Sequence, residues 1–117
     1  MSKITLYHNP RCSKSRGACQ ILDGSKTDFE IVHYLQTPPT PKELKALSQK
    51  LKLPPTDFIR SKEKRFKELQ LSLRDERSDE EWFTLMAENP ILIERPIAVR
   101  ENRAVIARPP ERILDLL

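Results

Sequence analysis

Three short stretches at the start of the chain carry the hydrophobic patterns of two strands with a helix between them. Apolar side chains alternate with polar ones in residues 3–7, recur at helical spacing in 13–23, and form a second strand pattern in 29–34. A helix that joins two neighbouring strands of one sheet makes those strands parallel, with a right-handed crossover in nearly all proteins. The loop at 8–12 therefore lies at the carboxyl edge of the first strand, where open α/β sheets bind ligands.

Between about residues 37 and 89 the pattern indicates helices and no strand. Thr40 is the N-cap of one helix, Pro41 follows in its first turn, and Glu43 completes a capping box, which predicts a helix over 41–52. A second helical stretch is expected from 58–60 toward Leu69, and a capping box at 78–81 begins a third helix. The expected apolar faces comprise Leu44, Leu47 and Leu51 in the first helix, Phe66 and Leu69 in the second, and Trp82, Leu85 and Met86 in the third.

Strand patterns return near the C-terminus. Residues 97–100 and 104–107 flank Glu101-Asn102-Arg103, which predicts a tight hairpin in which Asn102 tolerates a positive φ. Pro109 and Pro110 then begin a final short helix, which carries Ile113, Leu114 and Leu117.

The resulting order of βαβ, helices and ββα resembles the thioredoxin fold. We therefore expect an α/β protein with a mixed four-stranded sheet, in a single domain over 1–117 that carries a helical insertion at about 37–89. In the thioredoxin fold the proline before the third strand is cis, so the resemblance predicts a cis bond between Arg95 and Pro96.

Composition excludes several classes of protein. Because 32% of the residues are charged and no apolar run approaches the roughly 20 residues of a spanning helix, we expect no membrane association. Met1-Ser2-Lys3 leads directly into a strand pattern without a signal-peptide core, which indicates a cytoplasmic protein. The two cysteines and two histidines lack zinc-site spacing, so no metal is expected.

The net charge of +4 is compatible with an anionic substrate or partner. The densest basic cluster, at 62–67, is typical of a solvated helix face, and no zinc-finger or RNA-recognition motif accompanies it, so nucleic-acid binding is not expected. No heptad pattern or long apolar strip indicates self-association, and we expect a monomer.

Cys12 is the candidate nucleophile. It stands in a polar loop immediately before the helix predicted over 13–23, where unpaired backbone N–H groups and the positive end of the helix dipole favour thiolate over thiol. Arg16, four residues after Cys12, and His8, four residues before it, would add positive charge. The pKa of Cys12 is therefore expected below that of a free cysteine.

The neighbouring positions exclude two common cysteine chemistries. Cys19 lies two helical turns beyond Cys12, about 10 Å away, whereas a disulfide needs Cα atoms within about 7 Å. We assign Cys19 to core packing with Ser15, Ala18 and Leu22. Ser15 occupies the position of a dithiol enzyme's second cysteine, and position 18 lacks the arginine of a phosphatase loop. An external thiol must therefore complete any redox cycle.

Three arginines are candidates for binding an oxyanion, because the guanidinium fork matches tetrahedral oxygens and stays charged. Arg60 lies in the helical insertion, Arg95 precedes the expected cis proline, and Arg108 ends the last strand. In the expected fold the loop before the third strand lies beside the Cys12 loop, which favours a role for Arg95 and Arg108.

Blocks of sequence along nearly the whole chain resemble the glutaredoxin-dependent arsenate reductases of the short chromosomal type, in the ArsC/Spx-like family. They are Tyr7-His8-Asn9-Pro10-x-Cys12 with Arg16, His33-Tyr34-Leu35-x-Thr37-Pro38, Arg60, Asn89-Pro90-Ile91-Leu92-Ile93-x-Arg95-Pro96-Ile97, and Arg108-Pro109.

The resemblance implies a role for each matching residue. Cys12 would be the nucleophile, Arg60, Arg95 and Arg108 would bind arsenate or arsenite, and His8, Ser15 and Arg16 would support the thiolate. Glutathione would be the co-substrate and glutaredoxin the partner, with no bound cofactor.

Two alternatives are compatible with the same sequence. The Spx regulators, which bind RNA polymerase, share the fold family, but they carry a Cys-x-x-Cys switch where this chain has Ser15. A thiol reductase or transferase with a different substrate would need the same reactive cysteine. Activity measurements with arsenate separate these functions from arsenate reduction.

Overall fold

The computed structural model describes residues 3–117. Met1 and Ser2, which belong to the segment in which we expect no signal peptide, lie outside the described residues. The chain forms two compact units. The first consists of the residues up to Thr37 together with Arg95–Leu117, and the second is Pro38–Glu94. The second unit contains most of the residues of the insertion expected at about 37–89 and extends to Glu94.

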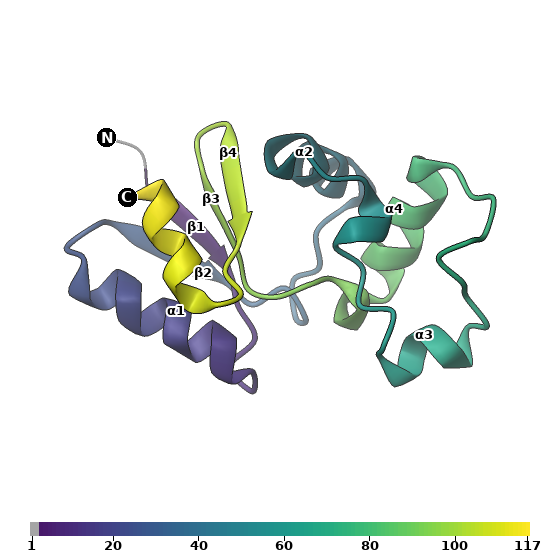
Figure 1. Ribbon diagram of the computed structural model, residues 1–117, viewed down its shortest axis with the longest axis horizontal. Coiled ribbons are helices and arrows are strands. Elements are labelled where there is room, and N and C mark those ends of the chain that lie inside the picture. Colours follow the sequence, from purple (N-terminus) through teal and green to yellow (C-terminus); the bar gives the residue numbers. More distant parts are fainter. Residues whose placement is uncertain (1–2) are drawn as a thin grey trace. The chain divides into compact units, whose positions relative to one another are not determined.

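The first unit is built on a mixed four-stranded sheet of the thioredoxin type, as the sequence predicts (Figure 1). Its elements are β1 (Ile4–Tyr7), α1 (Ser13–Gly24), β2 (Phe29–Val32), β3 (Ile97–Arg100), β4 (Arg103–Ile106) and the 3₁₀ helix η3 (Pro110–Leu116). The strand order is β2-β1-β3-β4. β1 pairs parallel with β2 and antiparallel with β3, and β3 pairs antiparallel with β4.

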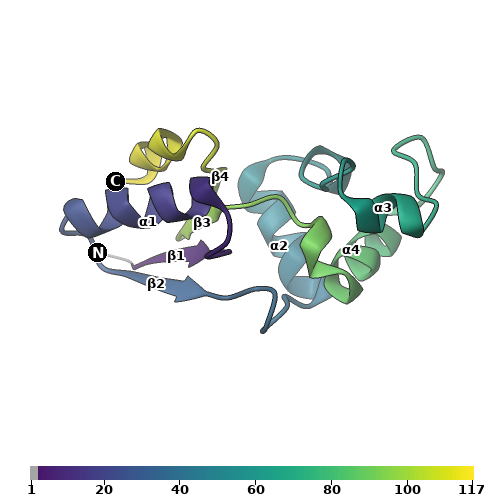
Figure 2. The same cartoon turned by 90° about the horizontal axis from the view of Figure 1, so that it is seen from below.

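Helix α1 and η3 lie on the same face of this sheet and enclose its core (Figure 2). The core residues come from the strands, from α1 and from the C-terminal segment: Ile4, Leu6, Ala18, Leu22, Ala98, Ala107, Ile113 and Leu116. Burial of each large aliphatic side chain contributes about 1.5–3 kcal/mol. Gly17 permits the close approach of the two helices, because a Cβ there would lie 3.0 Å from Pro110 Cγ.

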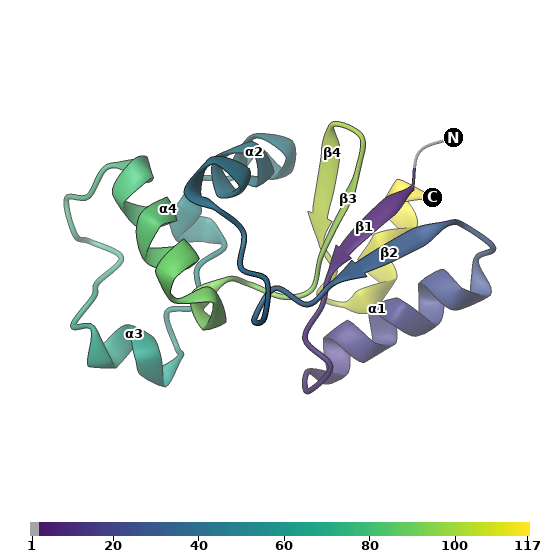
Figure 3. The same ribbon diagram turned by 180° about the vertical axis from the view of Figure 1, so that it is seen from behind.

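Strand direction and register bring four connecting segments to one edge of the sheet (Figure 3). The last residue of β1, Tyr7, pairs with Val32 at the end of β2 and with Ile97 at the start of β3. Ile97 also pairs with Ile106 at the end of β4. The loops that follow β1, β2 and β4 and the segment that precedes β3 therefore meet at this edge, which carries the Cys12 loop.

The second unit is mostly helical, and its two capping boxes confirm the sequence prediction. Its elements are α2 (Pro41–Leu51), η1 (Pro55–Asp57), α3 (Lys64–Glu68), α4 (Asp79–Glu88) and η2 (Pro90–Leu92). The Thr40 and Ser78 hydroxyls accept hydrogen bonds from the backbone N–H groups of Glu43 and Glu81, and both glutamates bond back to the cap residue. Helices α2 and α4 pack together, and both carry buried side chains: Leu44, Leu47, Trp82, Phe83 and Met86.

The expectation of a continuous helical stretch through 58–60 is wrong. Ile59 forms an isolated antiparallel bridge with Ile93. The Arg60 N–H donates to Leu92 O at 2.6 Å, and the Glu94 N–H donates to Phe58 O at 2.9 Å. These long-range hydrogen bonds pair backbone groups of residues 58–60 with those of 92–94 in an extended conformation. The helix is therefore confined to Lys64–Glu68, and the insertion is not purely helical.

Four details of the predicted hairpin and helix faces also differ from the structure. The hairpin turn is Glu101-Asn102, and the positive φ of 57° belongs to Glu101, because β4 already begins at Arg103, which pairs with Arg100. In η3, Leu116 is buried while Leu114 and Leu117 are exposed. In α4, Phe83 is buried and Leu85 only half-buried, and in α2 Leu51 is half-buried.

The Arg95–Pro96 bond is cis, which confirms the prediction, and the Arg108–Pro109 bond is cis as well. Within residues 3–117, no helix has both the length and the apolar character needed to cross a membrane.

Candidate active site

Cys12 is the N-cap residue of α1, held by a network of hydrogen bonds in the loop before the helix. Its backbone is extended, with φ −96° and ψ 123°. The Cys12 N–H donates to Asn9 O at 3.0 Å, and Cys12 O accepts the first helical bond from Arg16 N at 3.0 Å. Asn9 Oδ1 accepts from Arg11 N at 3.0 Å, and Asn9 N donates to the buried Ser15 hydroxyl at 3.4 Å. The loop therefore presents the thiol from a fixed position.

The surroundings of the Cys12 sulfur favour its thiolate. Partial burial raises the pKa of the thiol, but the backbone N–H groups of Ser15 and Lys14 oppose this effect, together with hydrogen bonds from the Arg95 guanidinium and the Ser15 hydroxyl. The net effect places the pKa of Cys12 below the ordinary cysteine value. Helix-terminal N–H groups and a guanidinium are the groups expected to activate a cysteine.

Arg95 links Cys12 to a buried tyrosine. Burial alone would lower the pKa of Arg95, but Tyr34 and Cys12 interact with the guanidinium and raise it above its ordinary value. Tyr34 is completely buried, and its hydroxyl oxygen is inaccessible, as are Nε and Nη1 of Arg95. The contact between Tyr34 and Arg95 therefore fixes a permanent cation beside the sulfur.

The other two candidate arginines lie in different units. Arg108 Nη1 donates to the backbone oxygen of Arg95 at 3.2 Å, so Arg108 lies beside the Arg95 segment in the first unit. Arg60 belongs to the second unit, where its Nη1 is 2.7 Å from Glu94 Oε1 and its Nε is 3.2 Å from Glu63 Oε1. Two carboxylates thus orient Arg60 within its own unit.

His8 and Arg16 have partners other than the Cys12 sulfur. His8 is buried, and its Nδ1 lies 3.8 Å from the Cys19 sulfur. Burial lowers the pKa of His8, as do the nearby charges of His33 and Arg16, while a hydrogen bond with the Ser15 backbone opposes them. Arg16 Nη1 donates to Pro10 O at 2.9 Å, which braces the loop. Among the three residues expected to support the thiolate, Ser15 is the one in direct contact with it.

Cys19 packs against the core of the first unit, as predicted, and is half-buried there. Burial and the charge of Asp23 raise the pKa of its thiol. Cys12 and Cys19 are both free thiols. The pKa is therefore lowered for Cys12, at the N-cap of α1, and raised for Cys19, within α1.

Tyr34 is the site residue that sequence reasoning missed. A positional signal was present, because Tyr34 lies two residues after the end of β2, the parallel partner of β1. Among the described residues, no group of three or more histidine, cysteine or acidic side chains could hold a metal ion.

The lowered pKa of Cys12 gives a pH prediction for the thiolate. Thiolate absorbance should rise with pH at a midpoint below that of unperturbed cysteine. Ser15→Ala should move the midpoint to higher pH, because it removes a hydroxyl that favours the charged form. The Cys12→Ser variant, which retains Cys19, supplies the baseline. A midpoint at or above that of free cysteine would contradict this electrostatic account.

Comparison with known proteins extends these observations to the whole chain. The ArsC family matches residues 7–116. The arsenate reductase of Escherichia coli (strain K12) is 38% identical over 117 residues, which cover 100% of this chain and 82% of that protein. The arsenate reductase of Neisseria meningitidis serogroup B is 39% identical over 118 residues, covering 100% of both. A solved arsenate reductase from Vibrio cholerae superposes with a TM-score of 0.92 at 42% identity, over 99% of this chain and 98% of that one. This chain therefore belongs to the ArsC family.

Proposed function

We propose that this protein reduces arsenate to arsenite, with Cys12 as its only nucleophile and with glutathione and glutaredoxin as the source of electrons. The observation that carries the proposal is a single activated thiol at the start of α1 with the Arg95 guanidinium bonded to it. The name shared by the Escherichia, Neisseria and Vibrio relatives supports arsenate as the substrate.

In the first step, the Cys12 thiolate attacks arsenic and one arsenate oxygen leaves as water. With dihydrogen arsenate, the products are a cysteinyl S–As(V) adduct and water, and the two negative charges remain on the adduct. Arg95, already at the sulfur, would neutralise the oxygens as the S–As bond forms, and Arg108 would assist from the adjacent segment. The stabilisation is electrostatic and needs no proton from either arginine.

The reductive steps use two thiols from outside the chain. Glutathione displaces a second oxygen of the adduct as water. The glutaredoxin thiolate then attacks the glutathione sulfur to form a disulfide, and the electron pair of the broken S–As bond reduces arsenic to As(III). Water finally cleaves the bond between arsenic and Cys12, which releases arsenite and regenerates the thiol. Overall, arsenic acid and two thiols give arsenous acid, one disulfide and water, so the two thiols supply both electrons. Ser15 and Cys19 explain this dependence, because neither position offers a second thiol within reach of Cys12.

The proposal assigns Arg60 to oxyanion or product binding, as the family resemblance implies. Glu63 and Glu94 already orient the Arg60 guanidinium, which would then bind the anion in that orientation. The two carboxylates also offset its charge, so we expect Arg60 to contribute less to arsenate binding than Arg95 does.

A coupled assay tests the proposed function. Arsenate, glutathione, glutaredoxin, glutathione reductase and NADPH are combined with the protein, and NADPH oxidation is followed. The rate should depend on arsenate and on both thiol components. Failure to observe an arsenate-dependent rate with all components present would contradict the proposal, and a faster rate with glutathione mixed disulfides would favour a thiol transferase.

A further inference from the structure

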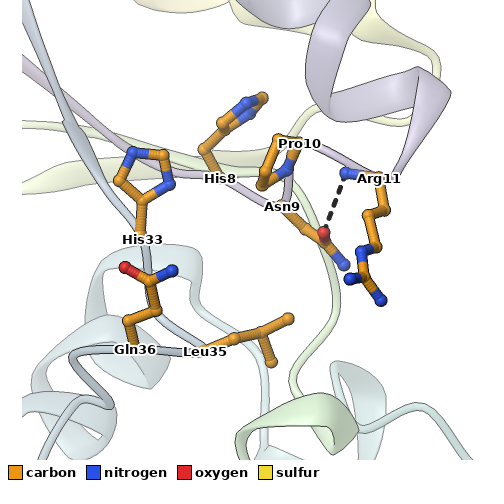
Figure 4. Close-up of a pocket in the computed structure, with 7 residues that line it drawn as sticks. All are labelled: His8, Asn9, Pro10, Arg11, His33, Leu35 and Gln36. Carbon is orange, nitrogen blue, oxygen red and sulfur yellow. Dashed lines mark hydrogen bonds between the residues drawn. The ribbon is translucent and has the colours of Figure 1, made fainter.

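A cavity of about 210 Å³ adjoins the loop that carries Cys12 (Figure 4). Its walls come from two segments of the first unit that follow neighbouring parallel strands. Asn9 and Arg11 from the loop after β1 lie on one side, and His33 and Gln36 from the segment after β2 lie on the other, with Leu35 below Asn9 in this view. Nothing in the mechanism proposed above uses this cavity.

The lining of the cavity carries positive charge and no negative charge. Arg11 is exposed and carries a permanent positive charge, whereas no lining residue is an aspartate or a glutamate. Asn9 and Gln36 add neutral amides, and burial lowers the pKa of His8, which disfavours its charged form. Such a lining suits a small ligand end that carries a carboxylate and an amide and no ammonium group.

We propose that this cavity binds the glycyl end of glutathione, with Arg11 pairing with the glycyl carboxylate, an inference that rests on the function proposed above. The glycyl end carries a net negative charge. The γ-glutamyl end is zwitterionic, and its ammonium group would lack a carboxylate partner among the lining residues.

The position of Arg11 in the sequence is compatible with this assignment. In glutathione the cysteinyl residue directly precedes the glycine, and in the protein Arg11 directly precedes Cys12. The cavity lined by Arg11 thus lies beside the loop that carries Cys12, and Gln36 and Asn9 can bond the amide that joins the glycine to the cysteine of glutathione.

The two histidines of the chain give a direct readout of occupancy, because both line this cavity. The test titrates the full protein with S-methylglutathione, which binds without reacting, and follows the imidazole proton resonances by NMR. Both histidine signals should shift saturably. Arg11→Gln should weaken the apparent affinity about fivefold, whereas Lys3→Gln, which removes an exposed charge elsewhere in the unit, should leave it unchanged.

A second ligand identifies the carboxylate. S-methylglutathione esterified at the glycine should bind wild-type protein about fivefold more weakly, and Arg11→Gln should then have no further effect. Equal binding of acid and ester, equal effects of the Arg11 and Lys3 variants, or no saturable shift of the histidine signals would each overturn the proposal. The titration contains no arsenate, so saturable shifts without arsenate turnover would reject the function and retain the site.

Discussion

Cys12→Ser is expected to reduce the arsenate-dependent rate to background, a loss of at least about 10⁴-fold in kcat, because a serine hydroxyl cannot replace the thiolate as nucleophile or electron donor. Cys19→Ser should retain most of the wild-type rate. Cys19 packs half-buried against the core, and serine keeps a small hydrogen-bonding group near His8 Nδ1. The coupled assay with both variants at matched concentration checks this.

The paired design separates chemistry from folding. Both substitutions replace a thiol with a hydroxyl near α1, so circular dichroism and thermal unfolding should be similar for the two proteins. An equal loss of activity in Cys19→Ser with unchanged unfolding would contradict the single-thiol mechanism, because it would indicate that Cys19 takes part in turnover.

Arg95→Ala should lower kcat/KM for arsenate by about 10²–10³-fold, since it removes the cation at the sulfur and one set of donors to the oxyanion. Arg95→Lys should recover part of this loss, because lysine keeps the charge and lacks the planar fork. Tyr34→Phe removes only the buried hydroxyl that contacts Arg95, so a loss of about 5–10-fold is expected. Steady-state kinetics with varied arsenate measure all three.

The pH profile distinguishes a positioning role of Tyr34 from a general loss of structure. The acid limb of kcat/KM follows deprotonation of Cys12, and Arg95 lowers the pKa of that thiol. The limb should therefore move to higher pH in Arg95→Ala. Tyr34→Phe should have no further effect once Arg95 is alanine. Independent, additive losses in the double variant would contradict the link from Tyr34 through Arg95 to Cys12.

Most of the fold was predictable because local rules and long-range packing agree. The strand patterns at 3–7 and 97–100, the capping residues Thr40 and Ser78, and the helix between 13 and 24 all have the structure that their sequence favours. The failures lie where tertiary contacts override the local pattern. Ile59 has an apolar context suited to a helix, but its bridge to Ile93 holds an extended backbone.

The candidate site was predictable to the extent that topology alone determines it. The position of Cys12 at the edge of the sheet, and of Arg95 before β3, follows from strand order. The partners of each side chain do not follow from it. Spacing suggested that His8 would act on Cys12, yet its ring lies against Cys19. Tyr34 gave only a positional signal in the sequence, because its role depends on the guanidinium that folding brings to it.

The most direct test of the single-thiol mechanism is to identify the covalent intermediate. The protein is incubated with arsenate and glutathione, without glutaredoxin, and analysed by intact and peptide mass spectrometry after acid quenching. We predict one arsenic-containing glutathione adduct, on the peptide that carries Cys12, with Cys19 still a free thiol. A disulfide between Cys12 and Cys19, or an adduct on Cys19, would contradict it.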